Sequence, residues 1–548
     1  KGDFYTAFIE RCLELTKDFG RFGLLTIHSF MFVSSYEKFR EDISTRAAIE
    51  SGCHLGPRSE FEISNPNAQG FVAITCRKGS EDVRLLNADD SWYGTWYRLV
   101  KAEGEEKRTL FEKQLTGQAE GAYVYQQAAF NSIPGCPWVY WITPGLRRLF
   151  VELDKLGEIA PAIHGTATYD NLRFLRFWWE VGINSIGFNN GCWDNFEACE
   201  KDYVPYMKGG SFKRWYGNQD YVVQLLKKGQ SLMEFLRGKK DSIRGSNYIF
   251  HRGVTWTDLT SAHFSARLSP GGFIFDVAGS SVFPPDIPLI LGIMNSKFSQ
   301  FALNIINPTV HVQVGDLARL PIPTESSKQL ERLVERAISL ARQDSSEDET
   351  TFDFIAPPWS ATLDDTLTDI WLREDALADV EKAIDEEVYR LYGIGEADRR
   401  AIESELAEPA AEGEDAEQEA GTDYIDEEEL SRRWISYAMG IVMGRFQPGV
   451  GALGGARFPP PVAAQMRSLA DNDGVATLDE GHQDDLAKKV HLVLELALGE
   501  AGAAEVIAAA LGEGDPEKLL RKYLERDFFK LHLQRYRKRP VYWLLQSP

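Results

Sequence analysis

The sequence predicts a multidomain protein of the α/β plus α+β class. Its 548 residues exceed what a single hydrophobic core usually organises. Apolar side chains make up 43% of the chain and aromatic ones 12%, which is ample for several cores. Helical and strand patterns alternate near the start of the chain, and they separate further along into a β-rich stretch and then a helical one.

The first part of the chain has the pattern of an α/β sheet. Apolar residues recur at helical spacing in 5–15, and the apolar run 24–27 is typical of a short buried strand. A second helix is predicted from Tyr36 to Ile49 and a second buried strand over 70–76. Residues 1–95 are too few for a complete doubly wound domain, so only part of such a sheet is expected.

The middle of the chain divides by composition. Residues 96–199 read as a spacer with a polar helical stretch at 100–117, and residues 200–325 as a mostly β domain rich in β-branched and aromatic residues. Helical spacing returns at 326–342, and a further helix ends at Gly393, which suits a C-cap. Residues 326–400 are therefore expected to form a helical pair, with an ordinary core face as the alternative.

The acidic character of the chain is confined to its second part. The net charge is −22, but residues 1–330 carry 36 basic and 36 acidic residues, which leaves 24 − 46 = −22 for residues 331–548. Residues 401–429 are predicted to be a solvated acidic linker, with an acidic interaction tail as the alternative. Residues 430–548 should form a helical C-terminal domain. The total charge therefore does not exclude a nucleic-acid partner.

The six cysteines form no CxxC pair and no cluster with histidines at zinc-ligand spacing. We therefore expect reduced, buried thiols, a cytoplasmic location and no metal. No run approaches about 18 apolar residues, so no membrane partner is expected. The chain begins at Lys1 rather than Met, and its first helix has no N-cap, which predicts a fragment of a longer protein.

Several catalytic patterns are missing from the sequence. No glycine-rich turn of the GxGxxG, GxxxxGK[ST] or FxGxG type follows a predicted strand, and the glycines of 449–455 follow a helix and predict a loop. An Asn/Asp-Pro-Pro-aromatic loop, which would hold a flipped base by its amino group, is also missing. The strings at 65–67 and 283–286 lack that order, no Ser/His/Asp triad or HExxH motif is present, and His28 and His311 are interpreted as structural. The sequence thus identifies neither a catalytic nor a cofactor-binding residue.

One segment does carry the chemistry of nucleic-acid binding. Residues 201–250 hold 10 basic and 4 acidic residues, and within 204–216 the basic side chains alternate with glycines and aromatics. Basic groups neutralise phosphates and aromatic rings stack on bases, although a solvated basic face over core aromatics is the alternative. The candidate DNA-binding residues are Lys208, Lys213, Arg214, Arg237, Lys239, Lys240, Arg244 and Arg252.

An ordered series of strings along the chain resembles the PglX/BrxX family, the adenine-specific DNA methyltransferases of BREX phage-defence systems. Its members are Tyr5–Arg11, Gly20–Thr26, Ser29–Phe32, Tyr169–Phe174, Tyr206–Gly210, Arg214–Asn218, Gly253–Trp256, Gly272–Asp276, Leu291–Lys297, Val314–Pro323, Ser436–Gly440, Gly444–Phe446 and Arg539–Trp543. The strings at 272–276, 291–297 and 314–323 also resemble target recognition domains of restriction-modification specificity subunits.

The resemblance implies a site-specific adenine-N6 methyltransferase that uses S-adenosylmethionine and binds double-stranded DNA. Other defence-system proteins and a phage-encoded inhibitor are further candidate partners. It also implies that residues 1–95 are the second half of a Rossmann-like methyltransferase sheet and that 200–325 are a target recognition domain. The family's cofactor and Asn-Pro-Pro-Tyr motifs would lie before Lys1, so this chain alone is predicted to be inactive.

Three alternatives to this interpretation remain at the level of sequence. One is a non-enzymatic DNA-specificity or adaptor subunit of a restriction or defence complex. The second is a PglX-like methylase of a DISARM-type system, and the third is an unrelated multidomain protein.

Overall fold

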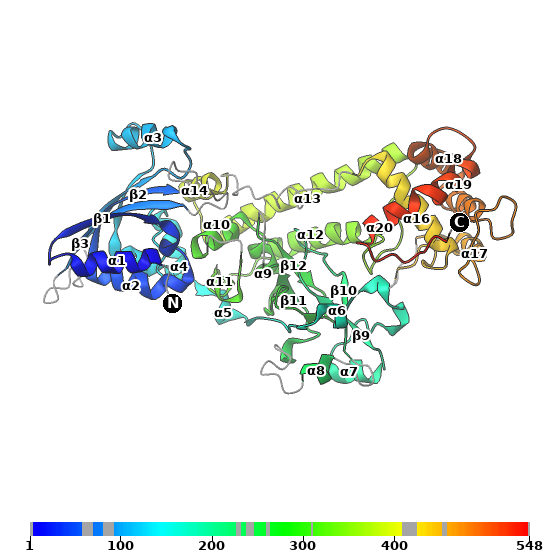
Figure 1. Ribbon diagram of the computed structural model, residues 1–548, viewed down its shortest axis with the longest axis horizontal. Helices are drawn as coiled ribbons and strands as arrows, with labels where there is room; N and C mark the ends of the chain where they lie inside the picture. The colour runs from blue at the N-terminus through cyan, green and yellow to red at the C-terminus, as the bar shows by residue number, and fades with distance from the viewer. Residues whose placement is uncertain are drawn as a thin grey trace.

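The computed structural model describes residues 4–56, 70–79, 92–225, 232–236, 246–258, 263–307, 311–407, 425–451 and 457–545. The molecule is elongated, with a sheet near the N-terminus at one end and a group of helices near the C-terminus at the other (Figure 1). A β-rich body lies between them. The long helix α13 (Leu363–Tyr392) runs from the middle of the molecule toward the C-terminal helices.

The N-terminal sheet has five strands in the order β1-β3-β2-β4-β5. Strand β3 pairs antiparallel with both β1 and β2, and β2 pairs parallel with β4, so the sheet is mixed. The apolar runs predicted at 24–27 and 70–76 are confirmed as strands. The strands are β1 (Arg21–Ile27), β2 (Ala47–Gly56), β3 (Phe71–Lys78), β4 (Tyr93–Arg98) and β5 (Ala122–Gln126).

One face of this sheet is covered by helices. Helix α1 (Phe4–Leu15) buries Ile9 and Leu13, and α2 (Glu37–Arg46) buries Ile43, in the same core as alternate residues of β3. The helix predicted over 36–49 is wrong at its end. Residues 47–49 belong to β2 and pair with 76–78 of β3, because cross-strand pairing outweighs the helical propensity of the two alanines.

Residues 99–152 extend the N-terminal unit. The polar helix expected at 100–117 is α3 (Glu105–Leu115), which lies over the other face of the sheet through Phe111 and Tyr97, whose ring centroids are 5.1 Å apart. Helix α4 (Pro144–Glu152) begins at Thr143, whose hydroxyl caps the amide of Leu146.

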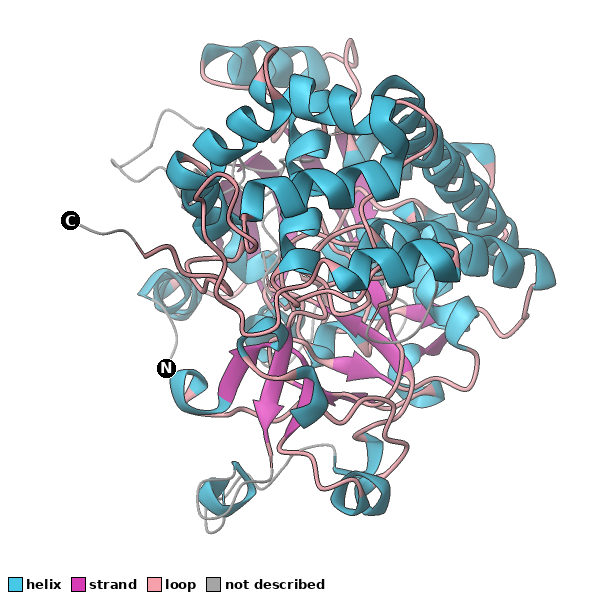
Figure 2. Ribbon diagram, turned by 90° about the vertical axis from the view of Figure 1, so that its right-hand side faces the viewer, coloured by secondary structure: helices cyan, strands magenta, loops and turns pink. Residues whose placement is uncertain are grey.

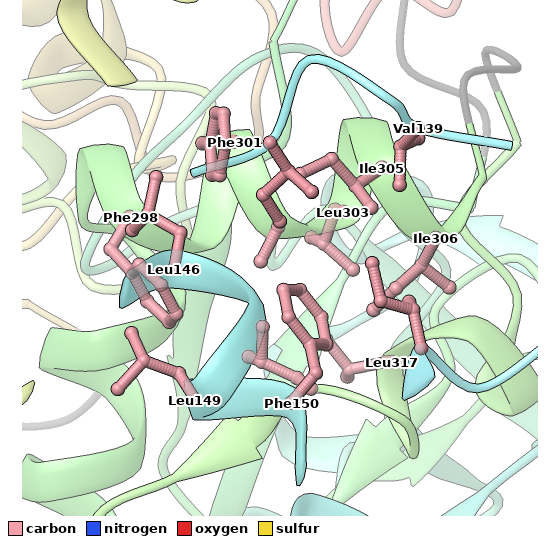
Figure 3. Close-up of a cluster of buried hydrophobic side chains, with 14 of the residues drawn as sticks. Val139, Leu146, Leu149, Phe150, Phe298, Phe301, Leu303, Ile305, Ile306 and Leu317 are labelled. Carbon is pink, nitrogen blue, oxygen red and sulfur yellow. The ribbon is translucent and has the colours of Figure 1, made fainter. Parts of the chain in front are cut away.

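Helix α4 joins the N-terminal unit to the rest of the chain. Its Leu146, Leu149 and Phe150 point into a cluster shared with Phe298, Phe301, Ile305 and Ile306 of helix α10 (Lys297–Ile306) and with Leu317 (Figure 3). These side chains are all buried. Burial of these apolar side chains stabilises the packing of segments about 150 residues apart in the sequence, which form one continuous core.

The central body contains two four-stranded sheets and a two-stranded one, ordered β13-β9-β10-β8, β12-β11-β14-β7 and β15-β6. Strands from residues 154–177 therefore pair with strands from 203–322. The bounds are β6 (Asp154–Lys155), β7 (Ala162–Ile163), β8 (Leu175–Phe177), β9 (Tyr203–Met207), β10 (Tyr221–Gln224), β11 (Gly253–Trp256), β12 (Ala266–Ser269), β13 (Ile274–Phe275), β14 (Ser281–Val282) and β15 (Pro321–Ile322).

The expectation of a mostly β domain over 200–325 misses two apolar helices. Helix α9 (Ile287–Met294) is capped by Asp286, α10 is capped by Ser296, and both are largely buried. The apolar run of α9 is continuous and shows no period by which helix and strand could be told apart. Helix α10 does carry helical spacing, with apolar residues at 298, 301, 302, 305 and 306 on one face, and the expectation of a mostly β domain overlooked it. Shorter helices are α5 (Leu156–Ile159), α6 (Asn171–Phe174), α7 (Trp193–Ala198), α8 (Leu232–Leu236) and α11 (Val314–Leu317).

Two long helices follow the central body. Helix α12 (Lys328–Ser346) packs along α13, and α13 ends at Gly393 in the left-handed conformation, which confirms the predicted C-cap. Helix α14 (Glu396–Leu406) then returns to the N-terminal unit, where Glu405 pairs with Arg98 at 2.7 Å. Most of the predicted acidic linker, 408–424, lies outside the described residues.

The C-terminal helices surround a core of their own (Figure 2). Helix α16 is almost entirely buried and packs against α18 and α13. The bounds are α16 (Glu427–Val442), α17 (Pro460–Ser468), α18 (Leu486–Leu511), α19 (Pro516–Arg526) and α20 (Phe528–Arg535).

Two expectations about the whole chain can be compared with the structure. All six cysteines are free, but only Cys76 is fully buried and Cys192 is exposed, so burial of every thiol is wrong. In the described ranges no single helix has the length and apolarity to cross a membrane, and only α9 and α10 together, across a 70° bend, meet such a test.

Candidate nucleic-acid interface

The basic and aromatic segment forms the connection between the antiparallel strands β9 and β10. Gly209 has a φ of +85°, and a Cβ there would lie 2.8 Å from the carbonyl oxygen of Ala278. The connection is held again where the Trp215 amide donates to Ala266 at 3.0 Å and the Asn218 amide side chain donates to Ser211 at 2.7 Å. The segment is thus a fixed platform between two strands.

Two of the predicted lysines lie on this platform. Lys213 is exposed and forms no ion pair with any described carboxylate, and the neighbouring Phe212 is 42% exposed. Lys208 is half-buried, with its Nζ atom 5.1 Å from the ring centroid of Tyr221. An exposed ammonium beside an exposed aromatic ring is the combination that binds a phosphate and stacks on a base.

Arg214 is engaged differently from Lys213. Its guanidinium lies 3.2 Å from Glu381 of α13, and the indole N–H of Trp215 donates to the same carboxylate at 2.7 Å. Glu381 therefore joins the platform to the long helix, 166 residues further along the chain. A half-buried arginine in this arrangement has a structural role that the sequence pattern did not predict.

The remaining candidates divide between two situations. Arg252 is exposed and lies just before β11, at the mouth of a cavity away from Lys213. Arg237, Lys239, Lys240 and Arg244 lie outside the described residues, so their role in DNA binding stays a prediction.

A buried arginine that the sequence reasoning missed lies beneath the platform. Arg267 of β12 is 0% exposed, and it donates to the hydroxyl of Thr257 at 3.0 Å and toward the Lys213 carbonyl at 3.4 Å. Burial lowers the pKa of Arg267 to about 10, so the group stays cationic at neutral pH. Alternation along β12 would have placed Arg267 with Ser269 on the face opposite Ala266 and Leu268, but all four residues of the strand are buried, so the sequence pattern did not indicate the burial of Arg267.

The basic C-terminal segment also reaches this part of the molecule. Tyr536 is fully buried in the core of the central body, Arg537 pairs with Asp220 at 3.0 Å, and the Trp179 indole donates to the Arg539 carbonyl at 3.1 Å. Lys538 is exposed between them, with a φ of +61°. Tertiary packing therefore brings the basic end of the chain against Asp220 and Trp179 of the central body.

Two proline-containing strings have structural roles. Asp286, which follows Pro284-Pro285, caps α9 by accepting the Leu289 amide at 2.9 Å. A second string, Ala-Pro-Pro-Trp at 356–359, was not considered in the sequence analysis. Its Pro-Pro-aromatic order matches that of a base-holding loop, but its first residue is alanine. Its Pro358 carbonyl already accepts the Trp434 indole at 2.9 Å, and alanine replaces the polar side chain that such a loop requires.

The described residues do not form an S-adenosylmethionine site on their own. A shallow cavity of about 340 Å³ lies on the face of the N-terminal sheet that α3 partly covers, lined by Gly23, Ser51, Thr75 and Tyr97 among others. None of its described lining residues is acidic, whereas a ribose hydroxyl in an open α/β sheet is usually held by a carboxylate. The lining therefore does not fit the cofactor.

A chain of three polar rings is buried at the end of β1 and in β2. His28 Nδ1 lies 2.7 Å from His54 Nε2, and His54 Nδ1 lies 3.1 Å from the Tyr140 hydroxyl. Burial lowers the pKa of His28 to about 4, and it lowers that of His54 well below its usual value, with the His28 charge as a second cause. This confirms the structural interpretation of His28.

Residues 1–61 match the family described as Eco57I restriction-modification methylase. Along its whole length the chain is 31% identical to the adenine-specific methyltransferase PglX of Lacticaseibacillus casei (strain Zhang), of which it covers 46%. It is 28% identical to the adenine-specific methyltransferase BrxX of Escherichia coli O9:H4 (strain HS), again over 100% of this chain and 46% of that protein.

The chain is thus similar along its whole length to two proteins of the PglX/BrxX family, the resemblance that its ordered strings predicted, and it spans slightly less than half the length of these curated relatives. Among solved structures it is similar to the type IIL restriction-modification enzyme MmeI in complex with DNA. That match has a TM-score of 0.43 at 13% identity and covers 74% of this chain and 51% of MmeI. A match to the type ISP enzyme LlaGI has a TM-score of 0.35 at 11% identity, over 64% and 31%.

Proposed function

We propose that this chain is part of a site-specific DNA adenine-N6 methyltransferase of a phage-defence system, and that it carries the recognition of the DNA target. The observation that carries the proposal is the full-length similarity to PglX and BrxX, both adenine-specific methyltransferases. The exposed Lys213 and Phe212 on the fixed connection between β9 and β10 support the assignment of DNA contact to the central body.

Methylation by the whole protein would depend on groups outside this sequence. No turn of the GxGxxG, GxxxxGK[ST] or FxGxG type follows a described strand, and the sequence contains no Asn/Asp-Pro-Pro-aromatic string. The cavity on its N-terminal sheet does not fit the cofactor by its described lining. We infer that the purified 548-residue chain binds duplex DNA and transfers no methyl group from S-adenosylmethionine.

Lys213→Ala tests the DNA-binding role in an electrophoretic shift series over several salt concentrations. If Lys213 neutralises one phosphate, its loss should weaken binding to all sequences and reduce the slope of log K against log salt by about one. Lys518→Ala is the matched control, because Lys518 is an exposed lysine of α19 in the C-terminal domain.

Arg214→Ala is unsuited to the same test. It would also remove the contact with Glu381, so weaker binding could arise from movement of the platform. Equal affinity and equal salt slope for the Lys213→Ala and Lys518→Ala proteins would overturn the assignment of the interface to this connection.

A further inference from the structure

A second cavity lies where the central body meets helix α12. Its volume is about 320 Å³, and its floor is formed by buried residues of β9 and β12 and of the segments after α12 and before β13. Pockets of roughly 300 Å³ and above hold small organic ligands. This one is too small for a duplex and large enough for a single nucleotide.

The charged groups at this cavity are all of one sign. Arg252 and Arg342 are its charged lining residues among those described, and both side chains are exposed at its mouth. Neither forms an ion pair with a described carboxylate. A guanidinium presents a planar fork of donors that matches a phosphate or a carboxylate. The mouth therefore suits an anion.

The walls supply aromatic surfaces. The rings of Phe188 and Phe352 stack at 5.5 Å between centroids, and the Arg342 guanidinium lies 5.6 Å from the Tyr216 ring. Tyr216 is fixed because its hydroxyl donates to Asp353 at 3.0 Å. Asp353 also accepts the Ser345 hydroxyl at 2.7 Å and is 6% exposed, so it lies behind the wall rather than in the cavity.

The backbone around the cavity is strained. Asn189, which lines it, has a φ of +58°, and Phe250, two residues before Arg252, has a φ of +71°. Trp215, next to Tyr216, has a φ of +68°. Phenylalanine and tryptophan rarely adopt the left-handed region, which costs about 1–3 kcal/mol at each of these two positions, whereas asparagine adopts it more readily. Such strain gathers at ligand sites.

From this combination we propose that the cavity is a binding site for a nucleoside phosphate, whose phosphate pairs with Arg252 and Arg342 and whose base lies against the aromatic walls. The ligand that provides this chemistry is either a free mononucleotide or one nucleotide of a bound DNA strand. The inference goes beyond the proposed function, because it concerns a separate pocket and holds whether or not Lys213 contacts DNA.

Titration calorimetry of the 548-residue chain with dAMP, adenosine and inorganic phosphate tests the site. We expect dAMP to bind more tightly than either part alone, because both the guanidinium groups and the rings contribute. Arg342→Ala should weaken dAMP binding about tenfold or more, since hydrogen bonds to charged groups are lost. Arg342→Lys should recover only part of this, because an ammonium lacks the planar fork.

Arg336→Ala is the matched control, as Arg336 is an exposed arginine of α12 that does not line the cavity. Displacement of dAMP by duplex DNA identifies the DNA strand as the source, and binding without displacement identifies a free nucleotide. The proposal is overturned if millimolar dAMP does not bind, if phosphate binds as well as dAMP, or if Arg342→Ala binds dAMP like the control. Duplex binding is then measured for the Arg342→Ala protein with and without Lys213→Ala. If duplex binding still depends on Lys213, the proposed function holds even where the nucleotide site fails.

Discussion

Acidification should destabilise the N-terminal sheet through the buried pair His28 and His54. In the neutral state two arrangements satisfy the chain of rings: the Tyr140 hydroxyl donates to His54 and His54 donates to His28, or His28 donates to His54 and His54 donates to the Tyr140 oxygen. One added proton can be accommodated, because a donor and an acceptor still face each other between the two histidines. A second cannot, because two N–H groups would then face each other.

The sign follows from the lowered pKa values. An unfolded histidine takes up a proton near pH 6.5, whereas folded His28 does so only near pH 4. Between these values the unfolded chain binds more protons, so the stabilising contribution is complete above pH 6.5 and is lost as the pH falls toward 4. From these two values His28 alone should cost about 2 kcal/mol of unfolding free energy between pH 7.5 and pH 5.

Urea unfolding followed by pulsed hydrogen exchange of peptides from β1 and β2 measures this sheet separately from the other cores. His28→Phe should reduce the loss of stability between pH 7.5 and pH 5 by about 2 kcal/mol. His482→Asn replaces an exposed histidine of the C-terminal domain and should leave the loss unchanged. If His28→Phe retained the full pH dependence of the unaltered chain, the reasoning from the buried ring chain would be refuted.

Two further substitutions in the N-terminal unit should lower the unfolding free energy measured in the same way. Arg40→Met removes a fully buried guanidinium that donates to the carbonyls of Phe30, Val33, Gly135 and Cys136. We expect the unfolding free energy to fall by about 3 kcal/mol, because these carbonyls lose their donor. A fall below about 1 kcal/mol would contradict this role. Gly52→Val places a Cβ atom 2.2 Å from the Trp96 ring and should lower the unfolding free energy by about 1–3 kcal/mol. Unchanged stability and unchanged tryptophan fluorescence would show that the ring moves aside without cost.

Local chemistry explains which elements could be predicted. The helix at 5–15, the strand at 70–76 and the C-cap at Gly393 depend on periodicity and on one glycine, and all are confirmed. The strand at 47–49 and the helix α9 could not be predicted in the same way. Their local sequences are compatible with both helix and strand, and pairing or burial elsewhere decides between them. Helix α10 carries helical spacing and could have been predicted from it.

The candidate interface shows the same division. Composition alone indicated that the segment around Lys213 combines positive charge with aromatic rings. It could not show that Arg214 is held by Glu381, that Arg537 from the end of the chain pairs with Asp220, or that Arg252 and Arg342 line the same cavity. Such pairings join residues far apart in sequence, and no local pattern encodes their distance.

The sequence by itself therefore determined the resemblance to the PglX/BrxX family, and it indicated the α/β, β-rich and helical stretches and the segment in which basic residues alternate with aromatic ones. These properties reside in residue types and short-range spacing, which survive without coordinates. Only the tertiary structure decided which charged groups are neutralised within the protein and which remain available to a ligand. Availability depends on burial and on partners contributed by distant elements, and both are created when the chain packs.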